Sequence, residues 1–152
     1  MTVVILIVVN PYMLRDPALI PLSRDHQHAL ALCVVAERVL GSDDSHAAAD
    51  AQARKIVDKF DSEIARHFEV EERILFPALA DFADVRDLIS ELLDEHSKLI
   101  ALVDRLRTDA NREIIAEFTT MLQAHVRKEE RQLFEEAQRL LSRERMDALA
   151  FQ

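Results

Sequence analysis

The sequence predicts an all-α fold, an up-down-up-down four-helix bundle with a short C-terminal helix and an N-terminal arm. Its 152 residues contain only one Gly and four Pro, too few chain breakers for a fold built from many turns. Hydrophobic residues recur at spacings of three and four over four long segments, which is the pattern of amphipathic helices. The segments between them are short, so consecutive helices are expected to run antiparallel.

Residues 1–17 are expected to form the arm and residues 18–152 the bundle. The run Thr2–Val9 is apolar and β-branched, but it is far shorter than the roughly 20 residues of a membrane-spanning helix. We interpret it as a strand or extended arm, which needs cover from the bundle or from a second copy in a homodimer because exposed strands aggregate. Alternatively, Met13 is the natural start and residues 1–12 are a non-native extension.

The first helix is expected to begin with a cap at Ser23 or a neighbouring residue and to end at the polar segment Gly41–Ser45. One face carries the residues that are expected in the core. These are Leu19, Leu22, His26, Ala29 or Leu30, Cys33, Ala36 or Glu37, and Leu40.

The second helix is expected from about Ala47 to Leu75, with Ser45 or Asp44 as its cap and Pro77 as the residue that ends or kinks it. A His and a Glu lie on a face that is otherwise apolar, which is unusual for a core-facing helix. The predicted inward residues are Ile56, Phe60, Ile64, His67, Glu71, Ile74 and Ala78.

The third helix is expected over about 85–107, and a short last helix over about 142–150. The fourth helix starts at Asn111 or Asp109 and runs to about residue 140. The inward residues of the third helix are Leu88, Leu92, Glu95 or His96, Leu99, and Leu102 or Val103. Those of the fourth helix are Ile114 or Ile115, Phe118, Leu122, His125, Glu129, Gln132 or Leu133, and Glu136.

One phrase occurs twice, as residues 67–76 (HFEVEERILF) and residues 125–134 (HVRKEERQLF). In both copies a His stands four residues before a Glu, so the two side chains share one face of a helix. Asp25-His26 and Glu95-His96 form a second repeated pair on the preceding helices. The pattern indicates a duplicated helical hairpin, with an acidic residue and a His on one helix and His-x-x-x-Glu on the next.

Six side chains on the inward faces are candidate metal ligands: His26, His67, Glu71, His96, His125 and Glu129. A single inward His is usually a satisfied core residue, but four of them with two otherwise costly buried carboxylates favour a metal site. Six ligands are too many for one tetrahedral zinc and too rich in nitrogen for magnesium or calcium. Two metals bridged by the carboxylates would use all six, and imidazole with carboxylate suits iron, with zinc or manganese as possible substitutes.

The ligand on the first helix has a competitor, because His28 lies two residues from His26 and points to another side of the helix. We prefer His26, which follows the inward face. His46 is expected in a loop. Glu72 and Glu130 lie beside the ligand face, and they are expected either in ion pairs with neighbouring Arg residues or as extra ligands or hydrogen-bond acceptors that fix a His tautomer.

At these residues the chain resembles the hemerythrin-like, or HHE cation-binding, family. The resemblance covers roughly residues 22–136. It rests on Asp25-His26, residues 67–77 (HFEVEERILFP), Glu95-His96 and residues 125–134 (HVRKEERQLF). It implies a four-helix bundle with a non-haem, carboxylate-bridged di-iron centre, in which the six candidate ligands correspond to the ligands of the family.

The chain departs from the oxygen-carrying members of that family. Their second His on the third helix is replaced here by Ile100. Their fourth-helix His is followed five residues later by Asp, where Glu130 stands in this chain, and Glu129 is the better placed carboxylate. A set of four His and two Glu is closer to bacterial relatives linked to repair of iron centres, nitrosative stress, or iron and oxygen sensing, and it disfavours simple reversible oxygen carriage.

The ligand set and the resemblance predict a domain that binds or senses a small diatomic such as dioxygen or nitric oxide. One alternative is a di-iron enzyme in iron-centre repair or in defence against peroxide and nitrosative stress, with Glu37 or Glu136 as its acid. Another is a metal-stabilised module for iron storage or interaction. Whether the protein is an enzyme stays open, and the sequence predicts no catalytic residue and no cofactor besides the two irons.

Composition limits the expected partners and compartment. The formal net charge of −9 disfavours nucleic acid, whose affinity depends on neutralised phosphates, and an anionic membrane surface. The single cysteine, Cys33, excludes an intrachain disulfide, which suits a reducing compartment and predicts a cytoplasmic protein. We expect Cys33 to be a small core residue of the first helix.

Overall fold

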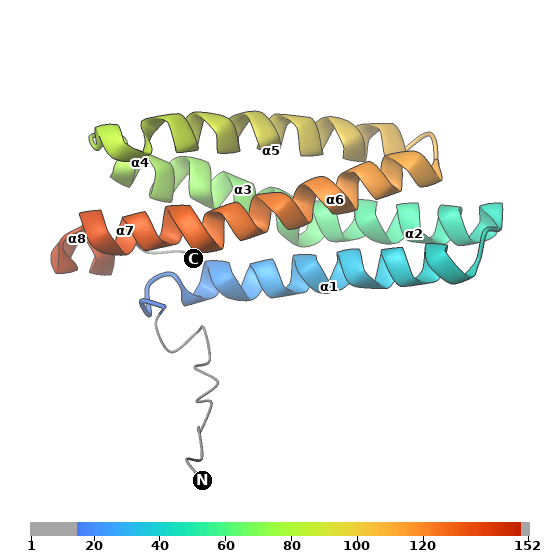
Figure 1. Ribbon diagram of the computed structural model, residues 1–152, viewed down its shortest axis with the longest axis horizontal. Helices are drawn as coiled ribbons and strands as arrows, with labels where there is room; N and C mark the ends of the chain where they lie inside the picture. Colours follow the sequence, from blue (N-terminus) through green and yellow to red (C-terminus); the bar gives the residue numbers. More distant parts are fainter. Residues whose placement is uncertain (1–14, 150–152) are drawn as a thin grey trace, which may run out of the picture.

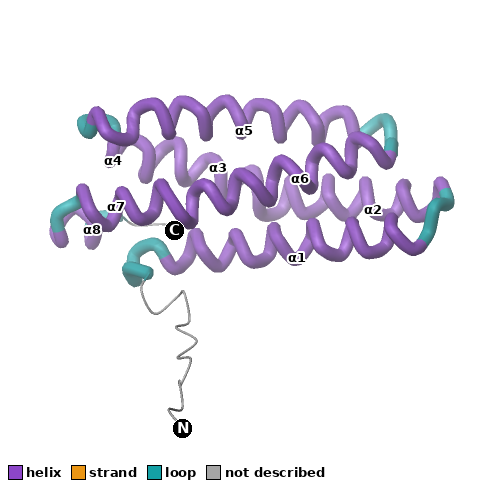
Figure 2. Tube along the Cα trace, viewed as in Figure 1, coloured by secondary structure: helices purple, strands orange, loops and turns teal. Residues whose placement is uncertain are grey.

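The computed structural model describes residues 15–149, and these residues form helices joined by short loops (Figures 1 and 2). Four long helices lie side by side in a bundle, which confirms the prediction of an all-α fold. The loops that follow the first and third long helices lie at one end of the bundle, and the loop that follows the second lies at the other (Figure 1). The arm predicted over Thr2–Val9 lies outside the described residues.

Two of the long helices contain π-helical turns, in which the backbone hydrogen bond spans one more residue than in an α-helix. The first long helix is α1 (Ile20–Ser42), and the third is α5 (Arg86–Leu106), which follows the 3₁₀ turn η4 (Ala83–Val85). The second consists of α2 (His46–Lys59), η2 (Phe60–Ile64), α3 (Ala65–Val70), η3 (Glu71–Leu75) and α4 (Phe76–Leu79). The fourth consists of α6 (Arg112–Lys128), η5 (Glu129–Leu133) and α7 (Phe134–Leu140), and the short α8 (Arg143–Asp147) follows it.

Side-chain caps begin three helices, and two of them lie at the predicted starts Ser45 and Asn111. Ser45 and Ser142 each accept a hydrogen bond from the backbone N–H three residues later, at 3.1 and 3.2 Å. Asn111 accepts one from the backbone N–H of Glu113 at 2.7 Å. These contacts satisfy N–H groups that have no partner within the first turn of a helix.

The predicted cap at Ser23 is wrong. α1 already begins at Ile20, and Pro21 lies in its first turn, where a proline loses no hydrogen bond. Ser23 is therefore inside the helix and buried. The second long helix also continues past Pro77 to Leu79, because Pro77 lies in the first turn of α4, directly after the widened π-helical turn η3.

The π-helical turn η3 shifts the buried face of its helix by one residue. Beyond Glu71, the predicted inward residues Ile74 and Ala78 are only partly buried, and Leu75 and Leu79 are fully buried instead. A π-helical turn adds one residue to the helix without breaking it. The 3.6-residue period that predicted the inward face is therefore displaced by one position.

The fourth long helix repeats this shift. Beyond Glu129, Leu133 and Ala137 are fully buried, whereas Gln132 is exposed and Glu136 is only partly buried. The π-helical turn η5 begins at Glu129, as η3 begins at the corresponding Glu of the other copy. The repeated phrase therefore encodes the same irregularity twice.

The core consists of two apolar clusters. One includes Cys33, Ile56 and Phe118 and lies toward the end where α1 joins α2. The other includes Leu75 and Phe134 and lies toward the opposite end. Cys33 is buried, as predicted, and burial raises the pKa of its thiol to about 12. The buried polar residues described below come from the helix positions between these clusters.

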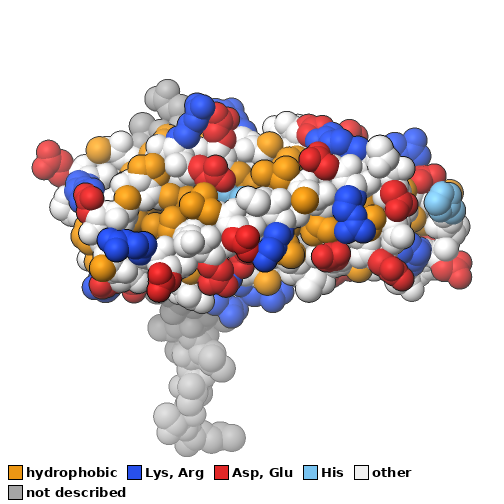
Figure 3. Space-filling model, turned by 90° about the horizontal axis from the view of Figure 1, so that it is seen from above, with side chains coloured by type: hydrophobic (Ala, Val, Ile, Leu, Met, Phe, Trp, Pro, Cys, Tyr) orange, Lys and Arg blue, Asp and Glu red, His pale blue; other side chains and the backbone are white. Residues whose placement is uncertain are grey.

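The surface carries charges of both signs. On the face shown in Figure 3, acidic and basic side chains are interspersed with hydrophobic ones. Some of these charges join helices, as Arg107 and Asp61 do at 2.7 Å. Within residues 15–149, no helix has both the length and the apolar character needed to cross a membrane.

We predict that Asn111→Ala lowers the free energy of unfolding by about 1 kcal/mol, because the first turn of α6 loses its side-chain acceptor. Asn111→Asp keeps an acceptor oxygen and serves as the control. Urea unfolding followed by circular dichroism measures both variants. An equal loss in the two variants would contradict the capping role.

Candidate metal centre

Six buried polar side chains meet between the two apolar clusters. Each long helix contributes one His, and the two helices with π-helical turns also contribute one Glu each. They are His26 on α1, His67 on α3, His96 on α5, His125 on α6, Glu71 at the start of η3 and Glu129 at the start of η5. None of them is more than 6% exposed. The fold thus brings together all six residues that the sequence suggested as ligands.

The six side chains form two groups of four that share both carboxylates. The donor atoms of His26, His67, Glu71 and Glu129 lie within 4.8 Å of one another, and so do those of Glu71, His96, His125 and Glu129. Each group therefore offers two imidazole nitrogens and two carboxylate oxygens. Either group could hold a metal ion.

The ring nitrogens of each group are placed like neighbouring ligands of one cation. His26 Nε2 and His67 Nε2 lie 3.0 Å apart, and His96 Nε2 and His125 Nε2 lie 3.2 Å apart. Two ligands at right angles and about 2.1 Å from a metal ion are separated by about 3.0 Å. Two unprotonated nitrogens at this distance repel each other, so a cation or a proton between them stabilises the arrangement.

The two carboxylates are the strongest sign of a cation site. Both oxygens of Glu71 and both oxygens of Glu129 are buried, and no donor outside the four imidazoles of the centre reaches them. Their close neighbours are imidazoles: His67 Nε2 lies 3.0 Å from Glu71 Oε1, and His26 Nε2 lies 2.9 Å from Glu129 Oε2. A buried carboxylate without a full set of donors is costly, and a bound cation would remove that cost.

A second layer of four carboxylates holds the outer nitrogen of each ring. The Nδ1 atom donates from His26 to Glu130 at 2.7 Å, from His67 to Asp25 at 3.2 Å, from His96 to Glu72 at 2.7 Å and from His125 to Glu95 at 2.7 Å. With the proton on Nδ1, each ring directs the free electron pair of Nε2 toward the centre. Acidic partners of this kind orient His ligands and make them stronger donors.

The second layer follows a two-fold pattern. Asp25 and Glu95 each hold the His on the other helix of their own hairpin, whereas Glu72 and Glu130 each hold a His of the opposite hairpin. Of the roles left open for Glu72 and Glu130, the structure has them as hydrogen-bond acceptors. Sequence reasoning missed the role of Asp25 and Glu95, and the one signal for it was their place directly before a His.

The competing His residues lie outside the centre. The side chain of His28, the competitor of His26, is 56% exposed and lies 3.5 Å from Glu63. His46 is exposed as well, and it is the first residue of α2 rather than part of a loop. The preference for His26 over His28 therefore agrees with the position of both side chains.

The sequence of the bundle matches a known family. The profile described as the hemerythrin HHE cation binding domain matches residues 21–137. The chain belongs to this family. The match runs from α1 into α7 and spans all four long helices, so the resemblance seen in the sequence is confirmed and the HHE domain is a metal-binding domain. No curated protein and no solved structure matches the chain.

Aromatic rings hold the imidazoles of the HHE domain in place. Phe68 stacks on His96 with 3.8 Å between ring centroids, and Phe76 lies 5.8 Å from the same ring. Phe134 stacks on His26 at 5.4 Å with an angle of 12° between the planes. These apolar contacts restrict rotation of the rings and keep water away from the donor atoms.

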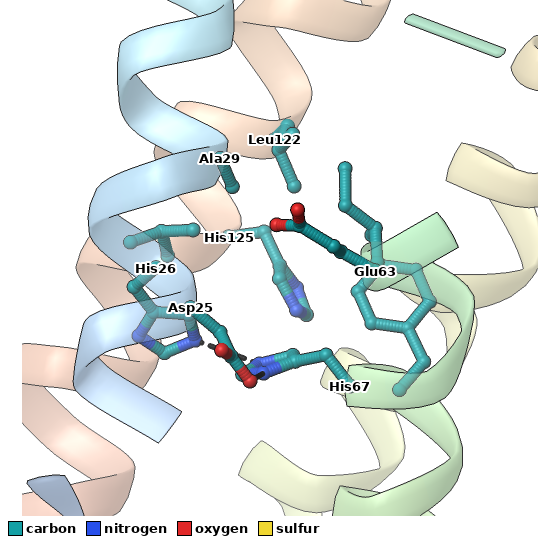
Figure 4. A pocket seen from close by; sticks show the side chains of 10 residues that line it. Asp25, His26, Ala29, Glu63, His67, Leu122 and His125 are labelled. Carbon is teal, nitrogen blue, oxygen red and sulfur yellow. Dashed lines mark hydrogen bonds and ion pairs between the residues drawn. The ribbon is translucent and has the colours of Figure 1, made fainter. Parts of the chain in front are cut away.

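A small cavity adjoins the first group of donors (Figure 4). Its volume, about 10 Å³ of space for the centre of a water-sized sphere, corresponds to about one water molecule. The wall is mostly apolar. Its polar part consists of the imidazoles of His26, His67 and His125 and the carboxylates of Asp25 and Glu63 (Figure 4). The apolar lining consists of Ala29, Ile64, Phe68, Leu122 and Val126.

In the metal-free HHE domain, the buried acids and bases control each other's pKa. Burial opposes charge on His67, but the negative charge of Glu71 and contacts with neighbouring acids raise its pKa well above the ordinary value. Burial also opposes charge on Glu129, yet the charge of His125 and other contacts with imidazoles hold the pKa of that carboxyl well below its usual range. Despite burial, Glu129 and other acidic contacts raise the pKa of His125 to about 10.

We predict that metal loading releases protons and that the affinity for a divalent cation rises with pH. The folded, metal-free domain keeps a proton on His125 up to a pKa of about 10, whereas a metal needs the unprotonated ring. Titration calorimetry with zinc in buffers of different ionisation enthalpy counts the released protons. Zinc binding at pH 7 without proton release would contradict the raised pKa.

The raised pKa of His125 also makes the stability of the metal-free domain depend on pH. A raised pKa in the folded state stabilises the metal-free domain below the ordinary His value of 6.5, and this contribution is lost as the pH rises toward about 10. The free energy of unfolding of the metal-free domain should therefore fall over this range. The metal-loaded domain should lack this decrease, because the metal has replaced the proton.

Proposed function

We propose that the HHE domain is a non-haem di-iron protein that binds or senses a small diatomic such as dioxygen or nitric oxide. The observation that carries the proposal is the pair of donor groups that share Glu71 and Glu129. Carboxylates common to two sets of imidazoles are natural bridges between two ions, as in other bundles with paired metals. Membership of the family supports cation binding, and the number and kind of ions are our inference.

The donor set favours iron. Imidazole nitrogen together with carboxylate oxygen suits iron, and zinc or manganese are possible substitutes. A single tetrahedral zinc would leave donors unused, and magnesium or calcium would need more oxygen. The proposed ligands are His26, His67, Glu71, His96, His125 and Glu129.

The surroundings of the donors suit a small neutral ligand. Four protein ligands for each ion leave coordination positions open on a metal that accepts six. The cavity beside His26 and His67 has the volume of about one water molecule, which limits a ligand to a very small one, and its lining is mostly apolar. An apolar wall admits a neutral diatomic more readily than a charged ligand, which would lose its hydration there.

The alternative functions have less support. A di-iron enzyme in iron-centre repair or in defence against peroxide and nitrosative stress needs an acid or base beside the ions. The two candidates for that acid lie at the surface, where Glu37 contacts Gln123 at 2.5 Å and Glu136 contacts Arg139 at 3.0 Å. A metal-stabilised module for iron storage or interaction would not use the apolar cavity.

The proposal includes the organisation of the chain. An up-down-up-down order of the four long helices agrees with the positions of their loops (Figure 1). The boundary between arm and bundle is proposed after residue 17, and the arm would serve a homodimer. The free thiol of Cys33 suits a cytoplasmic location.

We expect protein purified without added metal to contain about two irons per chain, the number that a carboxylate-bridged pair requires. Metal analysis together with the visible spectrum tests this, and the spectrum of the reduced protein should change on exposure to nitric oxide or dioxygen. Iron-free protein, or one zinc per chain, would remove the basis of the proposal. If the protein contains iron but its spectrum responds to neither gas, the proposal of metal binding stands and the proposal of a diatomic ligand fails.

Removing a shared ligand should differ from removing an unshared one. Glu71→Ala takes a donor from both groups, so both irons should be lost, whereas His26→Ala takes a donor from one group and should leave about one iron per chain. His28→Ala is the matched control two residues away, and it should keep both irons because His28 is exposed. Equal iron content in the three variants would contradict the ligand assignment.

A further inference from the structure

Arg15 lies outside the ligand set and contacts it through one carboxylate. Its side chain is only 8% exposed. Nη2 donates to Glu130 Oε2 at 3.1 Å and to the backbone carbonyl of Glu130 at 2.9 Å. The other oxygen, Glu130 Oε1, accepts the Nδ1 proton of His26 at 2.7 Å. Glu130 therefore lies between a permanent cation and a ring that faces the metal centre.

The surroundings of Arg15 fix its position. Nη1 donates to Glu135 and to Gln138, both at 3.3 Å. The guanidinium also lies 5.2 Å from the ring centroid of Phe134, the ring that stacks on His26 on the inner side. The neighbouring backbone N–H of Asp16 donates to Gln138 at 3.0 Å. Arg15 is thus held by α7. It contacts both residues that lie against the His26 ring, Glu130 and Phe134.

The corresponding ring of the other hairpin has no such cation. His96 donates its Nδ1 proton to Glu72 at 2.7 Å, which matches the contact on His26. Over the part of the chain that the structure describes, no Lys or Arg forms an ion pair with Glu72, whose side chain is 42% exposed. In the sequence, Arg15 precedes its ring by 11 residues, and the residue 11 before His96 is Val85.

Among residues 15–149, Lys128 is the other Lys or Arg that contacts the second layer, and it contacts Glu95 rather than Glu130. Its ammonium group contacts Glu95, the acceptor of His125, and it is shared with the exposed Glu91. Its side chain is more exposed than that of Arg15, 19% against 8%. His26 and His96 are the two rings that bind a carboxylate of the opposite hairpin. Of these two, His26 is the one whose carboxylate, Glu130, also binds a buried cation.

A cation in this position has a definite electronic effect. A carboxylate on the outer nitrogen makes an imidazole a stronger donor to its metal. A guanidinium that binds the same carboxylate withdraws negative charge from it, so the ring becomes a weaker donor. The positive charge of Arg15 also favours the ion with the lower charge. Both effects favour ferrous over ferric iron.

We propose that Arg15 is a positioning residue that holds Glu130 on His26 and raises the ferric-to-ferrous reduction potential of the iron bound by that ring. The inference rests on the proposed di-iron function. Arg15 does not change which residues bind the iron, because it contacts the centre through Glu130 and Phe134 and not directly. His26 and His96, whose outer nitrogens are held by carboxylates at the same distance, become unequal donors.

The test compares Arg15→Gln with Arg131→Gln, a matched control on the same helix as Glu130 that removes one exposed positive charge. Redox titration of the iron-loaded variants measures the potential. At a fixed solution potential, the ratio of ferrous to ferric iron at one position should fall on the order of tenfold in Arg15→Gln and stay unchanged in Arg131→Gln. Arg15→Lys keeps a cation without the planar fork and should restore part of the shift.

A second measurement needs no iron. In the zinc-loaded protein, the NMR signal of the His26 Nδ1 proton should move downfield in Arg15→Gln, because Glu130 becomes a stronger acceptor. The signal of His96 in the same molecule should stay in place.

Unchanged potentials together with an unmoved His26 signal in Arg15→Gln would overturn the inference and leave Arg15 as an anchor of the chain end. If the protein takes up no iron, the proposed function fails, and the His26 signal still decides whether Arg15 acts on the ring. A shift of equal size in Arg131→Gln would also overturn the inference, because any lost charge would then have the same effect.

Discussion

The rest of the structure depends on the burial of two carboxylates in the middle of a helical bundle. Glu71 and Glu129 are inaccessible to solvent, their close polar neighbours are imidazoles, and a buried charge without a full set of partners is among the most costly features that a fold can contain. Four imidazoles surround them, one from each long helix. A cation that binds at this place would join all four helices at once, so metal binding and folding are coupled.

The metal-free state deals with the same constraint by holding protons. Imidazoles that face buried carboxylates have a raised pKa, and Glu129 has a lowered one. Protons between the rings and the carboxylates therefore replace part of the missing positive charge. They are weaker partners than a metal ion, because each proton serves one pair of atoms whereas a cation can contact every donor of a group.

The π-helical turns follow from the need to continue the apolar core on both sides of this polar layer. His67 and Glu71 lie one turn apart and face inward together. After Glu71, the turn η3 adds one residue, so Leu75 takes the inward position and Glu72 points to the opposite hairpin, where it holds His96. The second copy repeats this arrangement at η5. Wide turns at ligand positions are a frequent feature of functional sites.

The bundle and the meeting of the buried His and Glu residues at its centre could be predicted from the sequence because both depend on helical spacing. A His four residues before a Glu has one geometric meaning on an α-helix, and its repetition excluded coincidence. The register beyond Glu71 could not be predicted, because a π-helical turn has no marker in an amphipathic pattern. Asp25 and Glu95 belong to a repeated acidic-His pair in the sequence, but which ring each of them holds depends on how the helices pack. Arg15 could not be found because its contact with Glu130 joins residues 115 positions apart.

The balance of charge explains why the second layer consists of acids and why two cations approach it. In the proposed di-iron form, two shared carboxylates and four outer ones surround two divalent ions, and Arg15 and Lys128 contact two of the outer carboxylates. Six negative charges then face six positive ones. One bound ion would leave the cluster with an excess of negative charge in a medium that screens it poorly, and this excess attracts a second ion. The acids outside the rings therefore favour two bound ions over one. The positions of Arg15 and Lys128 then decide how equally the two ions are bound.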